Sequence, residues 1–404
     1  MLVAHTPSGP VRGRRVAVTG VGALTCAGVG VDALWRALTR AEAPETKRVA
    51  PFDASHLGGP KELRRLDPFA LYALMAADEA WRQSGLTGPL EDAGSVVTTG
   101  IGGLQTVLEQ VVVLTGKGPD RVSPFMVPMM MPNAATAAVS MRFGLGGPCE
   151  TVTTACAAGT HALGNAARLV ASGRCPVVVA GGAEAVMVEI AEAGFRNMTA
   201  LSNVDLSRPF DRDRDGFVMG EGAGIVVLEE WDHALERGAT ILAEVIGAAS
   251  TADAFHITAP DPDGRGAVRC MELALADAQI GPGDISHINA HGTSTPLNDL
   301  AEAVAVRRVF GEFSPPVTSI KGHLGHSLAA AGALEGVASV QTLVHQLIPP
   351  TAGTTSLDPS IDLNVVVGAP LEGHVETVLS NSFGFGGHNG SVIFRRFNPD
   401  DVSA

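Results

Sequence analysis

The chain has 404 residues, 46% of them hydrophobic and 17% charged, which is typical of a large globular protein with a substantial core. Its 28 basic and 42 acidic side chains give a formal net charge of −14, which argues against general nucleic-acid binding and against docking on an anionic membrane. No stretch resembles a signal peptide or a membrane span, so we expect a cytoplasmic protein. The five cysteines form no C-x-x-C pair and favour reduced thiols over a disulfide framework.

A first strand is expected over residues 15–20, and it runs into the sequence G-V-G-A-L-T at residues 20–25. This sequence resembles the opening of a dinucleotide-binding fingerprint, but Thr25 occupies the place of the third glycine. A tight turn after a buried strand is the better interpretation. Residues 61–84 have helical spacing, and the basic side chains Lys61, Arg64 and Arg65 are grouped at the start.

Residues 122–133 read V-S-P-F-M-V-P-M-M-M-P-N and hold four of the chain's 11 methionines. Methionine fills irregular apolar space and adapts to varied ligands. The run therefore suits an apolar ligand, and it suits core or subunit-interface packing equally well.

The stretch C-E-T-V-T-T-A-C-A-A-G, residues 149–159, is the most informative in the chain. Residues 150–154 predict a short buried strand, and residues 155–170 predict a helix whose small side chains would let another backbone approach closely. Cys156 then sits where a strand turns into a helix, and the free N–H groups and dipole of the helix would lower the pKa of its thiol. Such a thiol is placed to attack an acyl group, although most cysteines are simply small buried apolar residues.

A second half begins near Ala243 and repeats the pattern of the first. Residues 271–292 parallel residues 75–100, residues 316–335 parallel residues 150–164, and residues 386–394 parallel residues 220–228. These paired β–α units predict two similar α/β halves, residues 1–242 and 243–404, that face each other. We expect a functional site where the halves meet.

Reactive or orienting groups follow the ends of four predicted strands, beside glycines. They are Cys156, His291 in N-A-H-G-T-S-T-P, Lys321 and His326 in S-I-K-G-H-L-G-H-S, and the glycine loop at residues 380–389. A cysteine nucleophile with two histidines is the minimum set for acyl transfer. Two acidic side chains, Asp299 and Glu302, are candidates to hold Lys321.

Four motifs occur in order along the chain: T-A-C-A-A-G, N-A-H-G-T-S-T-P-x-x-D-x-x-E, K-x-x-x-x-H-x-x-x-A-A-G-A-x-E and N-S-F-G-F-G-G-x-N-G. With them the chain resembles the elongating β-ketoacyl-acyl-carrier-protein synthases of the thiolase superfamily, over nearly its whole length. The resemblance implies a five-layered α-β-α-β-α fold and an acyltransferase that carries out a decarboxylative Claisen condensation. It also implies no metal and no cofactor, because the phosphopantetheine arm arrives with the acyl carrier protein substrate.

The resemblance also implies roles for particular residues. Cys156 would hold the acyl chain as a thioester, and His291 and His326, as neutral hydrogen-bond donors, would promote decarboxylation of the malonyl-carrier protein. Lys321, paired with Glu302, would maintain the electrostatics of the site. The oxyanion hole and a mobile gate would be formed by the backbone N–H groups of Cys156 and Phe385 and by the flanking glycines Gly384 and Gly386.

Two further sets of residues follow from the same resemblance. Ile101, Met126, Met131 and Phe195 would line an acyl tunnel, part of it contributed across a dimer interface. The basic residues Lys61, Arg64, Arg65 and Arg208 would dock the acidic acyl carrier protein.

The main functional prediction is a 3-oxoacyl-acyl-carrier-protein synthase of fatty-acid elongation. An alternative is the ketosynthase subunit of a type II polyketide or polyene pathway, since His388 and the A-C-A-A-G sequence depart from the commoner pattern. A non-condensing chain-length-factor-like partner would lack the nucleophile, and the presence of Cys156 with both histidines argues against it. The dimer would be formed with a second copy or with a homologous chain-length-factor subunit.

Overall fold

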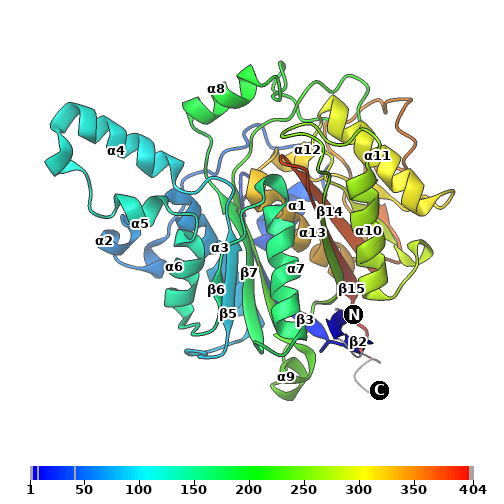
Figure 1. The fold of residues 1–404 in the computed structure, drawn as a ribbon, viewed down its shortest axis with the longest axis horizontal. Helices are drawn as coiled ribbons and strands as arrows, with labels where there is room; N and C mark the ends of the chain where they lie inside the picture. The colour runs from blue at the N-terminus through cyan, green and yellow to red at the C-terminus, as the bar shows by residue number, and fades with distance from the viewer. Residues whose placement is uncertain (1–2, 7–8, 41, 400–404) are drawn as a thin grey trace.

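The computed structural model describes residues 3–6, 9–40 and 42–399, and its strands run through the centre of the molecule between layers of helices (Figure 1). Its principal sheet has the order β11-β10-β14-β15-β9-β3-β8-β7-β5-β6, with β4 beside β3. Two small antiparallel pairs, β1–β2 and β12–β13, lie outside it.

The strands are β1 (Val3–Thr6), β2 (Gly9–Arg12), β3 (Val16–Thr25), β4 (Gly28–Val29), β5 (Gly94–Thr98), β6 (Cys149–Glu150), β7 (Val177–Glu184), β8 (Gly222–Glu230), β9 (Ala243–Ala252), β10 (His287–Asn289), β11 (Val317–Thr318), β12 (Leu347–Ile348), β13 (Leu371–Glu372), β14 (Thr377–Gly384) and β15 (His388–Arg396). The α-helices are α1 (Val31–Leu38), α2 (Pro60–Leu63), α3 (Pro68–Ser84), α4 (Leu104–Lys117), α5 (Met126–Met130), α6 (Ala134–Phe143), α7 (Ala158–Ala171), α8 (Glu189–Asn197), α9 (Trp231–Glu236), α10 (Arg265–Ala278), α11 (Pro296–Phe310), α12 (Lys321–Leu324) and α13 (Ala331–His345). Short 3₁₀ turns are η1 (Ser55–Leu57), η2 (Pro119–Arg121), η3 (Ala155–Ala157), η4 (Pro282–Asp284) and η5 (Leu328–Ala330).

The principal sheet consists of two halves with the same topology. From the centre outward, β3-β8-β7-β5-β6 and β9-β15-β14-β10-β11 each contain two antiparallel pairings followed by two parallel ones. The halves join through β3 and β9, which pair over only Val16–Val18 and Ala243–Val245. The expected boundary between residues 242 and 243 falls at the start of β9.

The helices complete the five layers that the family resemblance implies. Helices α7 and α13 occupy the middle layer, where α7 packs on β7, β5 and β15 while α13 packs on β8 and β14. Helices α3 and α6 cover the outer face of the first half-sheet, and α10 covers that of the second, with α11 packed on α10.

Glycines let the two central helices touch. A Cβ on Gly159 would lie 2.5 Å from the backbone nitrogen of Ala333, and a Cβ on Gly332 would lie 2.6 Å from that of Thr160. The close backbone approach predicted for the small-residue helix is therefore correct, and its partner is the corresponding helix of the other half.

Several local predictions were wrong. Residues 20–25 do not form a tight turn: β3 continues to Thr25, and Gly20 and Gly22 allow α3 to approach, since a Cβ on either would lie about 2 Å from a helix carbonyl oxygen. The helix expected over residues 61–84 is two helices, because Asp67 caps a new one that starts at Pro68. The strand expected at residues 150–154 is limited to β6, and the following helix begins as a 3₁₀ turn.

In the described part of the chain, no helix has the length and apolar character needed to cross a bilayer.

Candidate active site

A cavity of about 360 Å³ lies between the two halves of the fold. Its lining includes Cys156 and Phe195 from the first half and His291, His326 and Phe385 from the second. The structure therefore brings the predicted nucleophile, both predicted histidines and the predicted gate residue to one place, at the junction where the sequence predicted a site.

Cys156 is presented by a strained turn. The preceding residue, Ala155, has a left-handed φ of 49°, which is unusual for a residue with a Cβ and persists only where the surroundings hold it. Cys156 follows in η3, just before α7, and is only 6% exposed.

The expected lowering of the thiol pKa was wrong. Burial raises the pKa of Cys156 to about 11, because an ionised sulfur at this position would lose its water. The positive charge of Lys321 and the backbone N–H groups of Phe385 and Cys156 oppose the increase without cancelling it. The sequence revealed the helix N-terminus but not the depth at which the thiol is buried.

The glycine loop between β14 and β15 lies directly against the nucleophile. A Cβ on Gly384 would lie 3.0 Å from the carbonyl oxygen of Thr154 and 3.1 Å from the backbone nitrogen of Cys156. Gly386 and Gly387 have φ values of 85° and 75°, which L side chains rarely adopt. The backbone N–H groups of Phe385 and Cys156, the two predicted to form an oxyanion hole, both stabilise the ionised form of the Cys156 sulfur.

The two histidines lie edge to face, with ring centroids 5.4 Å apart, and each is 2% exposed. Burial and the nearby charge of Lys321 hold both pKa values well below 6.5. Both rings are therefore neutral at physiological pH, as the proposed role of hydrogen-bond donor requires.

Lys321 sets the orientation of His291. Its Nζ donates to the carbonyl oxygen of His291 at 2.6 Å and lies 3.4 Å from Nδ1 of the same residue. An ammonium group only donates hydrogen bonds, so Nδ1 is the accepting nitrogen and the ring proton is on Nε2.

The predicted pairing of Lys321 with Glu302 was wrong, because Lys321 forms a buried ion pair with Glu335. Glu302 instead accepts the backbone N–H groups of His291 at 2.8 Å and Gly292 at 2.7 Å. Burial raises the pKa of Glu302 to about 8. Glu335 was part of the motif read from the sequence, but no role was assigned to it there.

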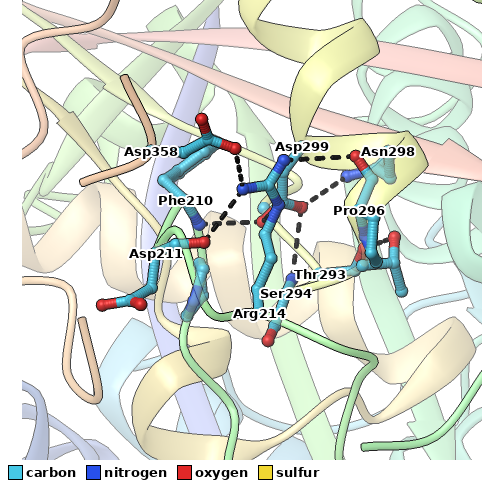
Figure 2. Close-up of polar contacts among 12 residues, drawn as sticks. Phe210, Asp211, Arg214, Thr293, Ser294, Pro296, Asn298, Asp299 and Asp358 are labelled. Carbon is cyan, nitrogen blue, oxygen red and sulfur yellow. Dashed lines mark hydrogen bonds and ion pairs between the residues drawn. The ribbon is translucent and has the colours of Figure 1, made fainter. Parts of the chain in front are cut away.

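Asp299 does not hold Lys321 either. Its carboxylate accepts the backbone N–H groups of Phe210 at 2.8 Å and Ser294 at 3.2 Å, two residues with left-handed φ values of 66° and 70°. Arg214 lies beside it, 3.7 Å from the carboxylate, and donates to Asp358 at 2.6 Å. Figure 2 shows this cluster of polar contacts.

The predicted tunnel residues are divided between two places. Phe195 lines the cavity and packs edge-on against Phe217, which in turn packs edge-on against His326. Ile101 and Met131 are 42% and 41% exposed, Met126 is half-buried, and none of the three lines the cavity. Met126 is the first residue of α5, Ile101 precedes α4 and Met131 follows α5. Helices α4 and α5 form an arm that projects from the body (Figure 1).

The predicted docking residues are also divided. Lys61, Arg64 and Arg65 are exposed in and after α2, where Arg65 stacks over the ring of Phe125 at 4.2 Å. Arg208 is more buried, with its side chain 19% exposed and 3.4 Å from Asp215, so it is less available to a partner.

Within the described ranges, no group of three or more His, Cys, Asp or Glu side chains is arranged to hold a metal ion.

Comparison with known proteins identifies the family. Residues 39–234 match the model of the β-ketoacyl synthase N-terminal domain, and residues 242–355 match that of the C-terminal domain. The chain belongs to the β-ketoacyl synthase family.

A relative from Synechocystis, 3-oxoacyl-[acyl-carrier-protein] synthase 2, is 42% identical over 95% of this chain and 98% of its own length. Among solved structures, the ishigamide ketosynthase/chain length factor has a TM-score of 0.89 and 34% identity, over 96% of this chain and 100% of that one. A type II polyketide acyl-carrier protein in complex with its hexaketide-bound ketosynthase gives a TM-score of 0.86 and 30% identity, over the same shares.

These findings confirm the predicted family, the thiolase-like fold and a condensing enzyme of the acyltransferase class. They support the main prediction, a 3-oxoacyl-acyl-carrier-protein synthase, better than the polyketide alternative.

Proposed function

We propose that Cys156 takes an acyl chain from acyl carrier protein and that the two histidines then direct its condensation with a malonyl unit. The observation that carries this proposal is the cavity that joins Cys156, His291, His326 and the N–H of Phe385. The Synechocystis relative, named for the same activity and similar over nearly the whole chain, supports it.

In the first step the Cys156 sulfur attacks the carbonyl carbon of the carrier-bound thioester. Because the thiol pKa is high, its proton passes to the neutral ring of His326 as the sulfur attacks, since Nδ1 of His291 faces Lys321 and its Nε2 already carries a proton. The carbonyl oxygen gains negative charge and accepts the N–H groups of Cys156 and Phe385. The carbon–sulfur bond to the carrier then breaks, and the departing thiolate takes up the proton.

In the second step a malonyl thioester loses CO₂, and the electron pair of the broken carbon–carbon bond forms an enolate. Its oxygen accepts hydrogen bonds from the ring N–H groups of His291 and His326. The enolate carbon attacks the acyl carbon on Cys156, the new carbon–carbon bond forms, and the sulfur leaves. The sequence of steps balances without a metal or redox cofactor, and we propose that none is used.

We further propose that the partner is an acyl carrier protein docked by local basic groups. The chain is acidic overall, with a net charge of −14, so attraction to an acidic carrier must come from a patch rather than from the whole surface. Lys61, Arg64 and Arg65 form the exposed candidate patch. A solved relative that holds its carrier protein supports this choice of partner.

The chain is proposed to work as a dimer in the cytoplasm. Among the described residues, strand β6 ends the sheet and pairs with β5 on one side only. Apolar side chains are exposed on α6, which packs on β6, and on the arm helix α4: Met141 is 78% exposed and Val112 70%. A second copy, or a homologous chain-length-factor subunit, would cover this surface and bring Ile101, Met126 and Met131 into a tunnel. The solution mass of the purified chain separates the two, since a monomer would indicate a missing subunit.

The decisive experiment is intact-protein mass spectrometry after mixing the protein with acyl-carrier proteins of graded chain length and saturation. We expect one acyl adduct that is absent in Cys156→Ala. His326→Ala should form the adduct more slowly and yield no condensation product with malonyl-carrier protein. Full condensation by Cys156→Ala would reject the proposal, and a preference for polyene or polyketide chains would favour the second candidate pathway, which the ishigamide and hexaketide relatives support.

A further inference from the structure

His161 connects the two segments that supply the oxyanion donors, although it lies outside the cavity. It is half-buried on the first turn of α7, five residues after the nucleophile. Its Nδ1 lies 2.7 Å from the hydroxyl of Thr154, and its Nε2 lies 3.0 Å from the backbone carbonyl of Asn389. One ring therefore bridges the residue before the strained turn and the strand that follows the glycine loop.

The chemistry of these partners determines the tautomer. A backbone carbonyl only accepts hydrogen bonds, so Nε2 carries the proton and Nδ1 accepts from the Thr154 hydroxyl. Burial lowers the pKa of His161, and His388 and Arg168 are the charged or titratable groups that also disfavour its protonation. The neutral ring thus makes both contacts at once.

The contact with Thr154 is placed to hold the segment that supplies the N–H of Cys156, and the contact with Asn389 is placed to hold the segment that supplies the N–H of Phe385. Thr154 directly precedes the left-handed Ala155, and its carbonyl oxygen accepts the N–H of Ala157 at 3.2 Å. Asn389 is 2% exposed, donates to Asp253 at 2.7 Å and pairs across the sheet with Phe383, two residues before Phe385.

We propose that His161 is a positioning residue. By bonding to both Thr154, which precedes the turn at Cys156, and Asn389, in strand β15, it keeps the N–H of Phe385 close to the Cys156 sulfur. It does not touch the substrate and has no proton-transfer role. The proposal rests on the proposed function of Cys156 as the nucleophile.

Two conservative variants separate the two contacts. In His161→Asn the amide oxygen lies near the Nδ1 position and can still accept from Thr154, whereas in His161→Gln the amide nitrogen lies near Nε2 and can still donate to Asn389. His161→Ala loses both contacts. His233→Gln is the matched control, because His233 is a half-exposed helical histidine with an Nδ1 contact to Glu229 and lies outside the cavity lining.

The readout is the rate at which iodoacetamide alkylates Cys156 between about pH 7 and pH 9. It is followed by mass spectrometry of the peptide that contains Cys156 in a Cys149→Ser background, because Cys149 is exposed and would also react. Loss of one N–H contact to the ionised sulfur should slow alkylation about tenfold at each pH in His161→Ala, with smaller losses in the Asn and Gln variants. The control should match the unsubstituted protein. Unfolding would expose the thiol and accelerate the reaction, so misfolding cannot imitate the expected result.

Alkylation needs no acyl substrate, so the proposal and the assigned function fail in different ways. If the unsubstituted protein forms no acyl adduct, the proposed function is wrong whatever His161 does. If all three His161 variants are alkylated and acylated as fast as the control, or are alkylated faster, His161 does not position the oxyanion hole.

Discussion

The ammonium group of Lys321 and the carboxylate of Glu335 form an ion pair in which neither side chain is more than 2% exposed. The same ammonium contacts His291 at both its carbonyl oxygen and Nδ1, so the pair supports a catalytic ring. Ser382, near the glycine loop, donates to the second carboxylate oxygen at 3.2 Å.

Removing one member of this ion pair should destabilise the fold. Glu335→Gln leaves a buried ammonium without its counter-charge, and we expect a loss of about 3–5 kcal/mol in the free energy of unfolding. The double variant Lys321→Met/Glu335→Leu should recover most of that stability but not the condensation activity, because His291 loses its partner. Urea unfolding and a condensation assay measure the two effects, and a double variant that is fully active would exclude this role of Lys321.

The raised pKa of Glu302 should be visible in the pH dependence of stability. Its folded pKa of about 8 lies above the reference value of 4.5, so between these values the unfolded state loses its proton while the folded state keeps it. Stability contributed by Glu302 is therefore present at low pH and decreases as pH rises through this window. Glu302→Gln does not titrate, so its stability deficit relative to the unsubstituted protein should narrow from about pH 5 to pH 8; a deficit that stays constant contradicts the assignment.

Acylation and alkylation of Cys156 should respond differently to pH. Direct alkylation needs the free thiolate, whose fraction rises about tenfold per pH unit below a pKa of about 11. If an imidazole takes the proton during acyl transfer, single-turnover acylation should stay nearly constant over the neutral range, where both histidines are unprotonated. Parallel increases in the two rates would show that no imidazole acts as the base.

The contact between the central helices should not tolerate a methyl group. Gly159→Ala would place a Cβ 2.5 Å from the backbone nitrogen of Ala333, and we expect a loss of at least about 1–3 kcal/mol in stability. Gly194→Ala in α8 is the matched control, since nothing lies within 4 Å of its Cβ position. It should be neutral or stabilising by about 0.5–1 kcal/mol. Equal thermal midpoints for the two variants would contradict the predicted clash.

Motifs and repeats predicted much of this molecule because they depend on local sequence. The duplicated β–α units predicted the matching half-sheets, and the glycine-flanked Cys156, His291 and His326 meet in one cavity. The break before α3 also had a local signal, because Asp67 followed by Pro68 is a typical helix start.

The errors concern properties that depend on packing between distant segments. The pKa of Cys156 depends on its burial among side chains such as Val186, Leu201 and Leu328, which are distant in the sequence. Lys321 has two acidic neighbours in the sequence, Glu302 and Glu335, and only the packing of the helices determines which of them it contacts. The sequence around Gly20 and Gly22 predicted a turn. These glycines instead make room for α3, a helix more than fifty residues away in the sequence. Ile101 and Met131 were expected to line a tunnel, but their apolar side chains are 42% and 41% exposed in this chain.

The strained turn before Cys156 has a counterpart in the other half. Leu328 has a φ of 48°, against 49° for Ala155, and each begins a 3₁₀ turn that leads into a central helix. A left-handed non-glycine residue lowers the stability of the fold by on the order of 1–3 kcal/mol. The molecule contains two such residues in equivalent turns, although only one of the turns carries a nucleophile. Because Gly159 and Gly332 allow α7 and α13 to pack in direct backbone contact, neither turn can change its conformation without displacing the other helix. The turn at Leu328, which carries no nucleophile, therefore constrains the turn that presents Cys156, and a change that relaxes one should also disturb the other.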